Sequence, residues 1–283
     1  MKDLRGSVAI ITGASRGIGV PIAEALARRG ARLVLAARSA EDLGRVSRGL
    51  EATGVEVLTV PTDVADRAAR AHLVAEAVRR FGAVDILINN AGIVQPSSYE
   101  RLSTEEIEQQ IEINLTAPMA LARLALPHML ERKRGHIVNI ASIGGLFGIG
   151  WVEPYSATKH GLVGFTRALR MACKASGTPV SASVICPGFI DGTGMYADGV
   201  RTYGRRASWM LGSSPSETVV ASVIKAIDRD RPEIIISPRP VRILLAIGAL
   251  SPRVGEWLVR KLGMHEIFEA AAQDSGRGRI APP

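Results

Sequence analysis

Short runs of apolar residues alternate with segments in which apolar residues recur every three or four positions. The runs are almost continuously apolar, which is typical of strands buried on both faces of a parallel sheet. The segments between them, such as 18–29 and 72–81, have the spacing of amphipathic helices. We expect strands at residues 8–12, 32–37, 55–59, 86–89, 136–140, 180–185 and 233–236.

This alternation predicts an α/β fold: a Rossmann-like, doubly wound parallel sheet of about seven strands in the order 3-2-1-4-5-6-7, with helices on both faces. Two longer helices should begin near Ser103 and Pro154. Ser103 is followed three residues later by Glu106, which is the signal of a capping box. Ser214 and Glu217 repeat that signal, with a proline between them that suits the first helical position.

Two regions depart from the alternation. Residues 189–213 are rich in glycine, arginine and serine, and a loop of this length inside a compact domain is usually functional or mobile. Residues 239–283 follow the last strand and are expected to form one or two helices before a frayed tail from about residue 275. We therefore divide the chain into a main domain, 1–238, and a C-terminal helical extension with a flexible tail, 239–283.

Composition narrows the class of protein. Of the 283 residues, 47% are hydrophobic and 22% charged, as in globular proteins. The formal charge of +8 is dispersed and aromatic residues are few, so we expect anionic small ligands rather than nucleic acid. Cys173 and Cys186 lack metal-ligand spacing, and no metal is expected. Two isolated cysteines, no apolar N-terminal signal and no apolar run of roughly 20 residues predict a cytoplasmic protein.

A glycine-rich turn lies where the first strand gives way to a helix. Gly13 permits a tight turn, and Gly17 and Gly19 let the backbone approach a pyrophosphate. The N-terminus of the following helix offers unpaired N–H groups and a partial positive charge to that anion. The residues that we assign to this part of a dinucleotide site are Gly13, Ser15, Arg16, Gly17, Ile18 and Gly19.

The end of the second strand indicates which dinucleotide binds. Sites that prefer NAD place an acidic residue there, about twenty residues after the turn, to bind the ribose hydroxyls. This chain has Ala37 followed by Arg38, and Arg16 lies in the glycine turn. Two guanidinium groups suit a 2′-phosphate, so the sequence predicts NADP(H). The alternative is that both arginines are merely solvated.

Tyr155 and Lys159 carry the candidate chemistry. Residues four apart on a helix share a face, so the ammonium group should lie one turn from the phenol. A free tyrosine has a pKa of about 10, and a nearby positive charge lowers it. Beside a nicotinamide, the pair can donate and accept the proton that accompanies hydride transfer. Alone, this spacing is usually an ordinary surface pair, and only its combination with the glycine turn favours catalysis.

The ordered set of motifs resembles the short-chain dehydrogenases/reductases over roughly residues 5–236. The glycine turn is similar to the cofactor motif of that family. Asp63-Val64 is similar to its adenine-contacting pair, and Asn89-Asn-Ala-Gly92 is similar to its N-N-A-G signature. Pro187-Gly188 resembles its nicotinamide-side turn. The positions of its four catalytic residues are occupied here by Asn114, Ser142, Tyr155 and Lys159.

The resemblance implies a role for each matching residue. Tyr155 would exchange the proton, Ser142 would hydrogen-bond the substrate oxygen, Lys159 would lower the Tyr155 pKa and bind the nicotinamide ribose, and Asn114 would hold a water linked to Lys159. The further residues implied in cofactor binding are Asp63, Val64, Asn90, Ala91, Gly92, Tyr155, Lys159, Pro187, Gly188, Ile190 and Thr193. Long helices that begin near residues 103 and 154 would pair two subunits, which implies a homodimer or homotetramer.

The sequence also departs from the family pattern. The family usually has threonine two residues after the position of Ile190, where it contacts the carboxamide. Here that residue is Gly192, and Thr193 follows one position later. Either the loop is shifted by one residue or another group makes the contact. Thr158 replaces the commoner serine inside the Tyr–Lys motif and keeps its hydroxyl group.

These observations predict an NADP(H)-dependent oxidoreductase that interconverts a ketone or aldehyde and an alcohol. A non-catalytic NADP(H)-binding regulatory or scaffold protein on the same fold is the alternative. Dehydration or epimerisation is a further possible reaction. The intact set of four catalytic positions argues against both.

Apolar residues near the site favour a bulky hydrophobic substrate, such as a steroid, lipid or acyl compound. They are Leu146, Phe147, Trp151, Phe189, Met195, Tyr196, Trp209 and Met210. The extension after residue 240 combines apolar residues with flanking arginines. It could pack on its own domain or on a second subunit, or it could touch a membrane or cap an oily substrate channel.

Overall fold

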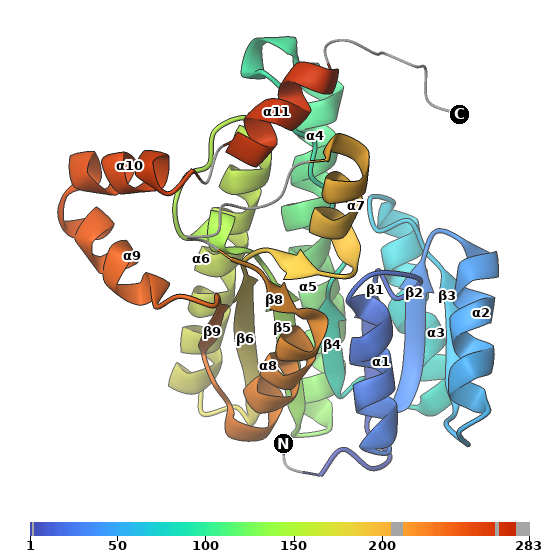
Figure 1. Ribbon diagram of the computed structural model, residues 1–283. Helices are drawn as coiled ribbons and strands as arrows, with labels where there is room; N and C mark the ends of the chain where they lie inside the picture. Colours follow the sequence, from blue (N-terminus) through green and yellow to red (C-terminus); the bar gives the residue numbers. More distant parts are fainter. Residues whose placement is uncertain (2, 205–211, 264–265, 276–283) are drawn as a thin grey trace.

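The computed structural model describes residues 1, 3–204, 212–263 and 266–275, and it shows a twisted parallel sheet between two layers of helices (Figure 1). The sheet has seven strands in the order β3-β2-β1-β4-β5-β6-β9, so the predicted fold and strand order are confirmed. Its strands are β1 (Val8–Thr12), β2 (Arg32–Ala37), β3 (Val57–Pro61), β4 (Ile86–Asn89), β5 (Gly135–Ile140), β6 (Val180–Pro187) and β9 (Glu233–Ile236).

The first residue of each strand lies within one position of the prediction, except in β3. It begins at Val57 and ends at Pro61, two residues later than expected, because Leu33 pairs with Val57 and Ala37 with Pro61. Proline lacks the N–H group that an interior strand needs, and an edge strand such as β3 tolerates it. The prediction ended before Pro61, although the ladder continues through it.

Each face of the sheet has its own hydrophobic core. On one face, Ile22 and Leu26 of α1 and Val223 of α8 pack against β1, β2 and β4. On the other, Leu73 of α3 and Leu121 of α5 pack against the opposite sides of the same strands. The helices of the first face are α1 (Gly19–Arg28), α2 (Ala40–Glu51) and α8 (Ser216–Arg229), and the second face carries α3 (Arg67–Phe81), α5 (Ala117–Glu131) and α6 (Glu153–Ala175).

One of the two predicted capping boxes is present. The Ser103 hydroxyl accepts from the Glu106 N–H at the start of α4 (Thr104–Ile111), and the Glu106 carboxylate accepts from the Ser103 N–H. The second prediction is wrong. Ser214 donates its N–H to the carbonyl of Phe189 and lies in a two-residue strand, β8 (Ser214–Pro215), which pairs with β7 (Ile190–Asp191). This pairing delays the start of α8 until after Pro215.

The two unusual regions contain more helix than expected. Residues 189–213 include α7 (Gly194–Tyr203), while Trp209 and Met210 lie outside the described residues. The extension forms α9 (Val241–Leu250), α10 (Pro252–Lys261) and α11 (Glu266–Ser275), where one or two helices were expected. The predicted frayed tail falls on residues 276–283, which also lie outside the description. Within the described part of the chain, no helix is long and apolar enough to cross a membrane.

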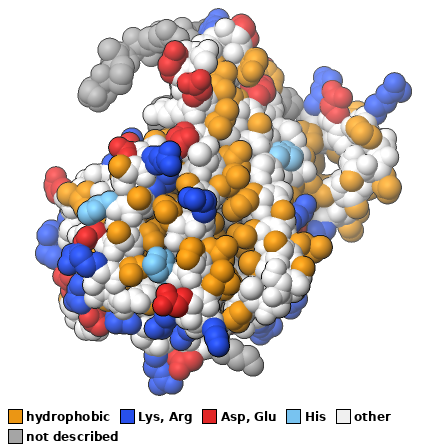
Figure 2. All heavy atoms as spheres, turned by 180° about the vertical axis from the view of Figure 1, so that it is seen from behind, with side chains coloured by type: hydrophobic (Ala, Val, Ile, Leu, Met, Phe, Trp, Pro, Cys, Tyr) orange, Lys and Arg blue, Asp and Glu red, His pale blue; other side chains and the backbone are white. Residues whose placement is uncertain are grey.

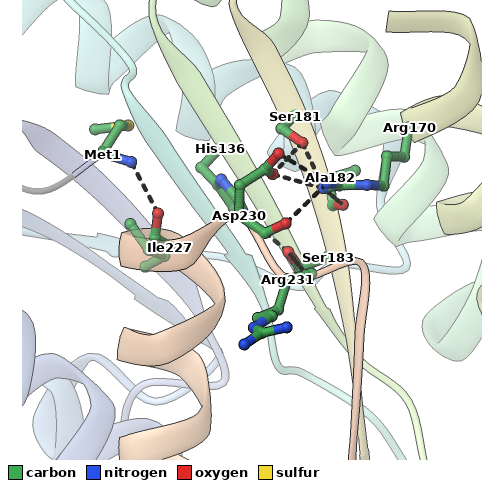
Figure 3. A network of polar contacts seen from close by, with 9 residues as sticks. All are labelled: Met1, His136, Arg170, Ser181, Ala182, Ser183, Ile227, Asp230 and Arg231. Atoms are coloured by element: carbon green, nitrogen blue, oxygen red, sulfur yellow. Dashed lines mark hydrogen bonds and ion pairs between the residues drawn. The ribbon is translucent and has the colours of Figure 1, made fainter. Parts of the chain in front are cut away.

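A partly buried polar network joins the amino ends of β5 and β6 to helices α6 and α8 (Figure 3). Arg170 donates to both carboxylate oxygens of Asp230 at 2.6 and 2.7 Å, and Ser181 donates to the same carboxylate. Nε2 of His136 lies 2.8 Å from the Ser183 hydroxyl. Burial lowers the pKa of His136 to about 4, although the Asp230 carboxylate acts in the opposite direction. The imidazole is therefore neutral at physiological pH.

This network makes the stability of the fold depend on pH. The pKa of His136 is about 4 in the folded protein against 6.5 for the unperturbed group, so the unfolded chain binds more protons between these values. The stabilisation is complete above pH 6.5 and is lost as the pH falls toward 4, by up to about 3 kcal/mol. Urea unfolding of the wild type and of His136→Gln should therefore converge in free energy as the pH falls. Parallel pH profiles would contradict this assignment.

Candidate active site

The residues singled out from the sequence gather at the carboxyl edge of the sheet. There β1 lies between β2 and β4, which is where the strand order reverses. Open α/β sheets bind ligands at such a switch point. The glycine turn follows β1, Asn90 follows β4, Ser142 follows β5, and Gly188 follows β6. Parallel pairing of these strands brings four segments that are distant in sequence to one edge.

The glycine turn has a backbone that only glycine fits. Gly13 and Gly17 both have φ of +64°, in the left-handed region. A β-carbon on Gly19 would lie 2.2 Å from the carbonyl oxygen of Gly13, which is too close for any other residue. Helix α1 begins directly after this turn, and no side chain caps its N-terminus. The N–H groups of its first turn are thus oriented toward the position where the pyrophosphate of a dinucleotide would fit.

Thr12 and Asn90 hold this turn to the end of β4. The buried Thr12 hydroxyl accepts from the N–H groups of Asn90 and Ala91 at 3.0 and 3.1 Å and donates to the Ile88 carbonyl. The Asn90 side chain donates to the carbonyls of Thr12 and Gly13. The amide of Asn90, predicted to contact the cofactor, therefore supports the turn itself. Sequence reasoning gave no role to Thr12, although a hydroxyl residue directly before the first glycine was a usable signal.

Ser142 and Tyr155 face each other across a short turn. The Ser142 hydroxyl lies at the start of η3 (Ile143–Gly145) and hydrogen-bonds the Tyr155 phenol. A β-carbon on Gly144 would lie 3.5 Å from the Ser142 oxygen and 3.6 Å from the Tyr155 ring. A β-carbon on Gly145 would meet the Lys159 carbonyl oxygen at 2.6 Å. The two glycines thus let the serine turn lie directly against α6.

Lys159 lies beneath the tyrosine ring, as the helical spacing predicted. Its ammonium nitrogen is 5.6 Å from the ring centroid of Tyr155, within the range of a cation–π contact. The side chain is 3% exposed, and the nitrogen donates to the Ile140 carbonyl at 3.0 Å. Burial lowers the pKa of Lys159 to about 8. The group is still largely protonated at neutral pH, but its charge is far less stabilised than in water.

The direction of the Tyr155 pKa differs from the expectation. Burial raises the pKa of the phenol above its ordinary value, and the hydrogen bond from Ser142 only partly offsets this effect. Lys159 is not among the groups that lower it here. Desolvation thus dominates, and Tyr155 holds its proton firmly.

Asn114 enters the site from an irregular turn of helix. Residues Glu112–Thr116 form a π-helix between α4 and α5, a feature frequent at functional sites. The buried Asn114 amide accepts from the Ile93 N–H at 2.9 Å and donates to the Ile93 carbonyl at 2.8 Å. A β-carbon on Gly92 would lie 3.1 Å from Oδ1 of Asn114 and 3.5 Å from Nζ of Lys159. Asn114 and Lys159 are therefore neighbours, and the asparagine also fixes the chain after β4.

The two arginines expected at a 2′-phosphate have different surroundings. Arg38 is exposed at the end of β2. Arg16 extends from the glycine turn to Asp198 of α7, with 3.6 Å between Nη1 and Oδ2. The Asp63 carboxylate accepts from the N–H of Ala65 in its own turn, beyond β3. Arg38 and Asp63 thus follow β2 and β3, which β1 and β4 separate from β5 and the Ser142 turn.

The chain after β6 turns at Gly192 before it enters α7. Gly188 donates its N–H to the Ile236 carbonyl, which fixes the turn after Pro187 to β9. Ile190 pairs with the strand at Ser214. Gly192 then adopts φ of +78°, and Thr193 is the residue before the first turn of α7. Thr193 is thus the hydroxyl residue in this turn, one position later than in the family pattern.

Helix α7 and helix α11 cover the site with apolar side chains. The Met195 methyl group would be 3.4 Å from a β-carbon on Gly92, directly beside Lys159. Phe189 lies 4.9 Å from Tyr196 and 6.4 Å from Phe268, measured between ring centroids. The contribution of Phe268 was not predicted, because nothing in the sequence shows that the extension folds back over residue 189.

Comparisons with known proteins agree with this geometry. The sequence profile of a family described as short chain dehydrogenase matches residues 7–203. The ketoacyl reductase HetN of Nostoc is 37% identical over 279 residues, with 97% of this chain and 95% of that protein covered. A short chain dehydrogenase/reductase from Burkholderia phymatum in complex with NAD superimposes with a TM-score of 0.80 at 29% identity, covering 90% of this chain and 96% of that one. An actinorhodin polyketide ketoreductase with NADPH gives a TM-score of 0.75 at 32% identity, covering 83% and 97%.

The hydrogen bonds of the Thr12 hydroxyl provide a test of how the glycine turn is held. Thr12→Val keeps the shape of the side chain but leaves two partly buried N–H groups without their acceptor, which should cost about 1–3 kcal/mol of unfolding free energy. The dissociation constant for a dinucleotide should rise as well, because the turn loses its anchor. Thr12→Ser keeps the hydroxyl and serves as the matched control. Equal stability and equal dinucleotide affinity in both variants would show that the Thr12 hydroxyl does not hold the turn.

Proposed function

The chain belongs to the short-chain dehydrogenase family, whose members are oxidoreductases acting on CH–OH and C=O groups, and we propose that it uses NADP(H) to interconvert a bulky hydrophobic ketone and its alcohol. The observation that carries this proposal is the contact set of Ser142, Tyr155 and Lys159 at the edge where the glycine turn lies. A bound nicotinamide would supply or accept the hydride. The chain's own residues manage the oxygen atom and its proton.

Ser142 and Tyr155 are the proposed partners of the substrate oxygen. Their hydrogen-bonded oxygens form a pair of donors for a developing alkoxide. The raised pKa keeps the Tyr155 phenol protonated at neutral pH, which is the form needed to donate a proton during reduction. We therefore propose reduction of a carbonyl as the favoured direction. In oxidation, the same phenol must first lose its proton.

Lys159 is the proposed source of positive charge in the site. Its ammonium lies under the Tyr155 ring and beside Gly92, so it is placed to stabilise the phenolate that forms when the proton leaves. It could also bind the ribose of the dinucleotide with donors that Ile140 does not use. Asn114 is proposed as a positioning residue for this lysine and for the chain at Ile93.

NADP(H) is the proposed dinucleotide. The site has basic Arg38 after β2 and Arg16 in the turn, and Ala37 replaces the acidic residue that would repel a 2′-phosphate. The actinorhodin ketoreductase is described with NADPH, which supports the proposal, whereas the Burkholderia neighbour is described with NAD. Arg16 would have to exchange Asp198 for the phosphate.

A ketoacyl compound is the substrate class that we propose. HetN, which matches nearly the whole chain, is described as a ketoacyl reductase. The aromatic cluster of Phe189, Tyr196 and Phe268 and the methyl group of Met195 offer an apolar wall for an acyl chain. Trp151, four residues before Tyr155, has φ of +63°, a strained backbone that is frequent at functional sites.

We propose that two or more copies assemble through α4, α5 and α6. Figure 2 views the face that these helices cover and shows hydrophobic side chains gathered over it. Ile111, Met119, Leu130 and Met171 of these helices are 42%, 40%, 39% and 71% exposed. Large apolar side chains on neighbouring helices commonly mark contacts between proteins.

The cytoplasm remains our proposed location, and the free thiols of Cys173 and Cys186 support it.

Removal of the phenolic hydroxyl tests catalysis. Tyr155→Phe should lower kcat by at least about a hundredfold, because the alkoxide loses its proton donor. Dinucleotide affinity should change little. Cofactor oxidation over a panel of ketones and ketoacyl thioesters, measured beside the wild type, provides the readout. A wild type that binds NADPH but reduces no member of the panel would favour the non-catalytic scaffold, and an active Tyr155→Phe variant would remove the residue from the mechanism.

Charge reversal after β2 tests the choice of dinucleotide. Arg38→Asp should lower the ratio of kcat/KM for NADPH to that for NADH by at least about tenfold, the factor expected for one lost charge-assisted hydrogen bond. Arg48→Asp on the exposed side of α2 is the matched control and should leave the ratio unchanged. The same ratio in wild type and Arg38→Asp would refute the 2′-phosphate assignment.

A further inference from the structure

The hairpin of α9 and α10, residues 241–261, projects from the body of the protein (Figure 1). Its two helices pack chiefly on each other. A β-carbon on Gly255 would lie 2.8 Å from the Gly248 α-carbon, so the glycines allow a close helix crossing. Leu244, Leu245 and Leu258 are partly buried. The hairpin is thus held together by its own apolar contacts.

A second set of apolar side chains on the hairpin remains exposed. Leu250 at the tip is 89% exposed, Ile243 64% and Trp257 56%, and Ile247 and Val254 are exposed as well. Such large exposed fractions are unusual for several neighbouring apolar side chains and mark an interaction surface. Ile243, Ile247 and Leu250 are spaced by four and three residues and therefore share one face of α9.

Positive charge surrounds this apolar surface. The segment 239–262 contains five basic residues and one acidic residue, and all six are exposed. The basic residues are Arg239, Arg242, Arg253, Arg260 and Lys261, and the acidic residue is Glu256. Figure 2 shows hydrophobic and basic side chains next to each other on the projecting hairpin.

We infer that this hairpin is a docking element for the surface of a membrane that contains anionic lipids. Apolar side chains that enter the headgroup region, with arginine and lysine beside them, are the features of interfacial helices. A tryptophan suits the same boundary because it has an apolar ring and a polar N–H group. The hairpin lies on the surface and does not span the bilayer, since neither helix is long enough.

A second copy of this chain fits the hairpin less well. A two-fold interface places the same patch against itself, so two strongly basic hairpins would face each other and repel. An anionic lipid surface satisfies the charge and the apolar side chains together. The hairpin follows β9, whose last residue, Ile236, hydrogen-bonds Gly188 at the carboxyl edge of the sheet. Docking would therefore hold the edge that carries the candidate active site near the lipid.

Vesicle flotation of the full-length protein tests this inference without dinucleotide or substrate, so its outcome is independent of the proposed reaction. Wild-type protein should float with vesicles of phosphatidylglycerol and phosphatidylcholine in equal parts, and much less with phosphatidylcholine alone. Arg253→Glu/Arg260→Glu should reduce flotation on the anionic vesicles by at least about tenfold. Leu250→Asn/Trp257→Ala should reduce it by a similar factor.

Arg48→Glu/Arg67→Glu is the matched charge control, because both arginines are exposed on helices of the main domain. It should float like the wild type, and circular dichroism should show the same fold in every variant. The inference would be overturned if the wild type did not float, or if the control variant lost as much flotation as the hairpin variants. It would also be overturned if the wild type bound neither kind of vesicle and the hairpin variants changed the mass measured by sedimentation. The last result would assign the hairpin to a contact between copies.

Discussion

The burial of one ammonium group is the constraint on which the site depends. Lys159 is nearly inaccessible to water, and among the described hydrogen bonds its nitrogen has one acceptor, the carbonyl of Ile140. A buried cation is costly unless other groups compensate for the lost hydration. That cost is visible as a pKa of about 8. The site therefore contains a positive charge whose field acts through protein rather than water, directly under the Tyr155 ring.

The surrounding structure brings the reacting groups close to this charge. Gly145 lets the serine turn lie against the backbone of Lys159, and Gly92 leaves room beside its nitrogen. Thr12 and Asn90 fix the glycine turn to the strand that leads to Gly92. These residues lie at or just beyond the carboxyl ends of β1, β4 and β5 or on α6, so the parallel order of the sheet is what allows their contacts. The same desolvation raises the pKa of Tyr155, which favours the protonated phenol that the proposed reduction requires.

Local patterns in the sequence were sufficient for the fold and for the Tyr155–Lys159 pair, whereas Ser142 and Asn114 were assigned by the family resemblance. Continuous apolar runs located the strands, and the i, i+4 spacing placed Lys159 under Tyr155. The predictions that were wrong or missing depended on contacts between segments that are distant in the sequence. Ser214 has the sequence of a helix cap, but its N–H pairs with Phe189. The sign of the Tyr155 pKa shift follows from burial, which no local pattern encodes, and Phe268 reaches the site only because α11 folds back over α7.

Titration of Lys159 by NMR tests the central claim most directly. The ¹³Cε signal of this lysine, identified by its absence in Lys159→Met, can be followed against pH in the protein without dinucleotide. The account predicts a midpoint at about 8, far below the 10.5 of a hydrated lysine. A midpoint near 10.5 would show that the ammonium is solvated. That result would contradict the claim that a desolvated charge lies beneath Tyr155.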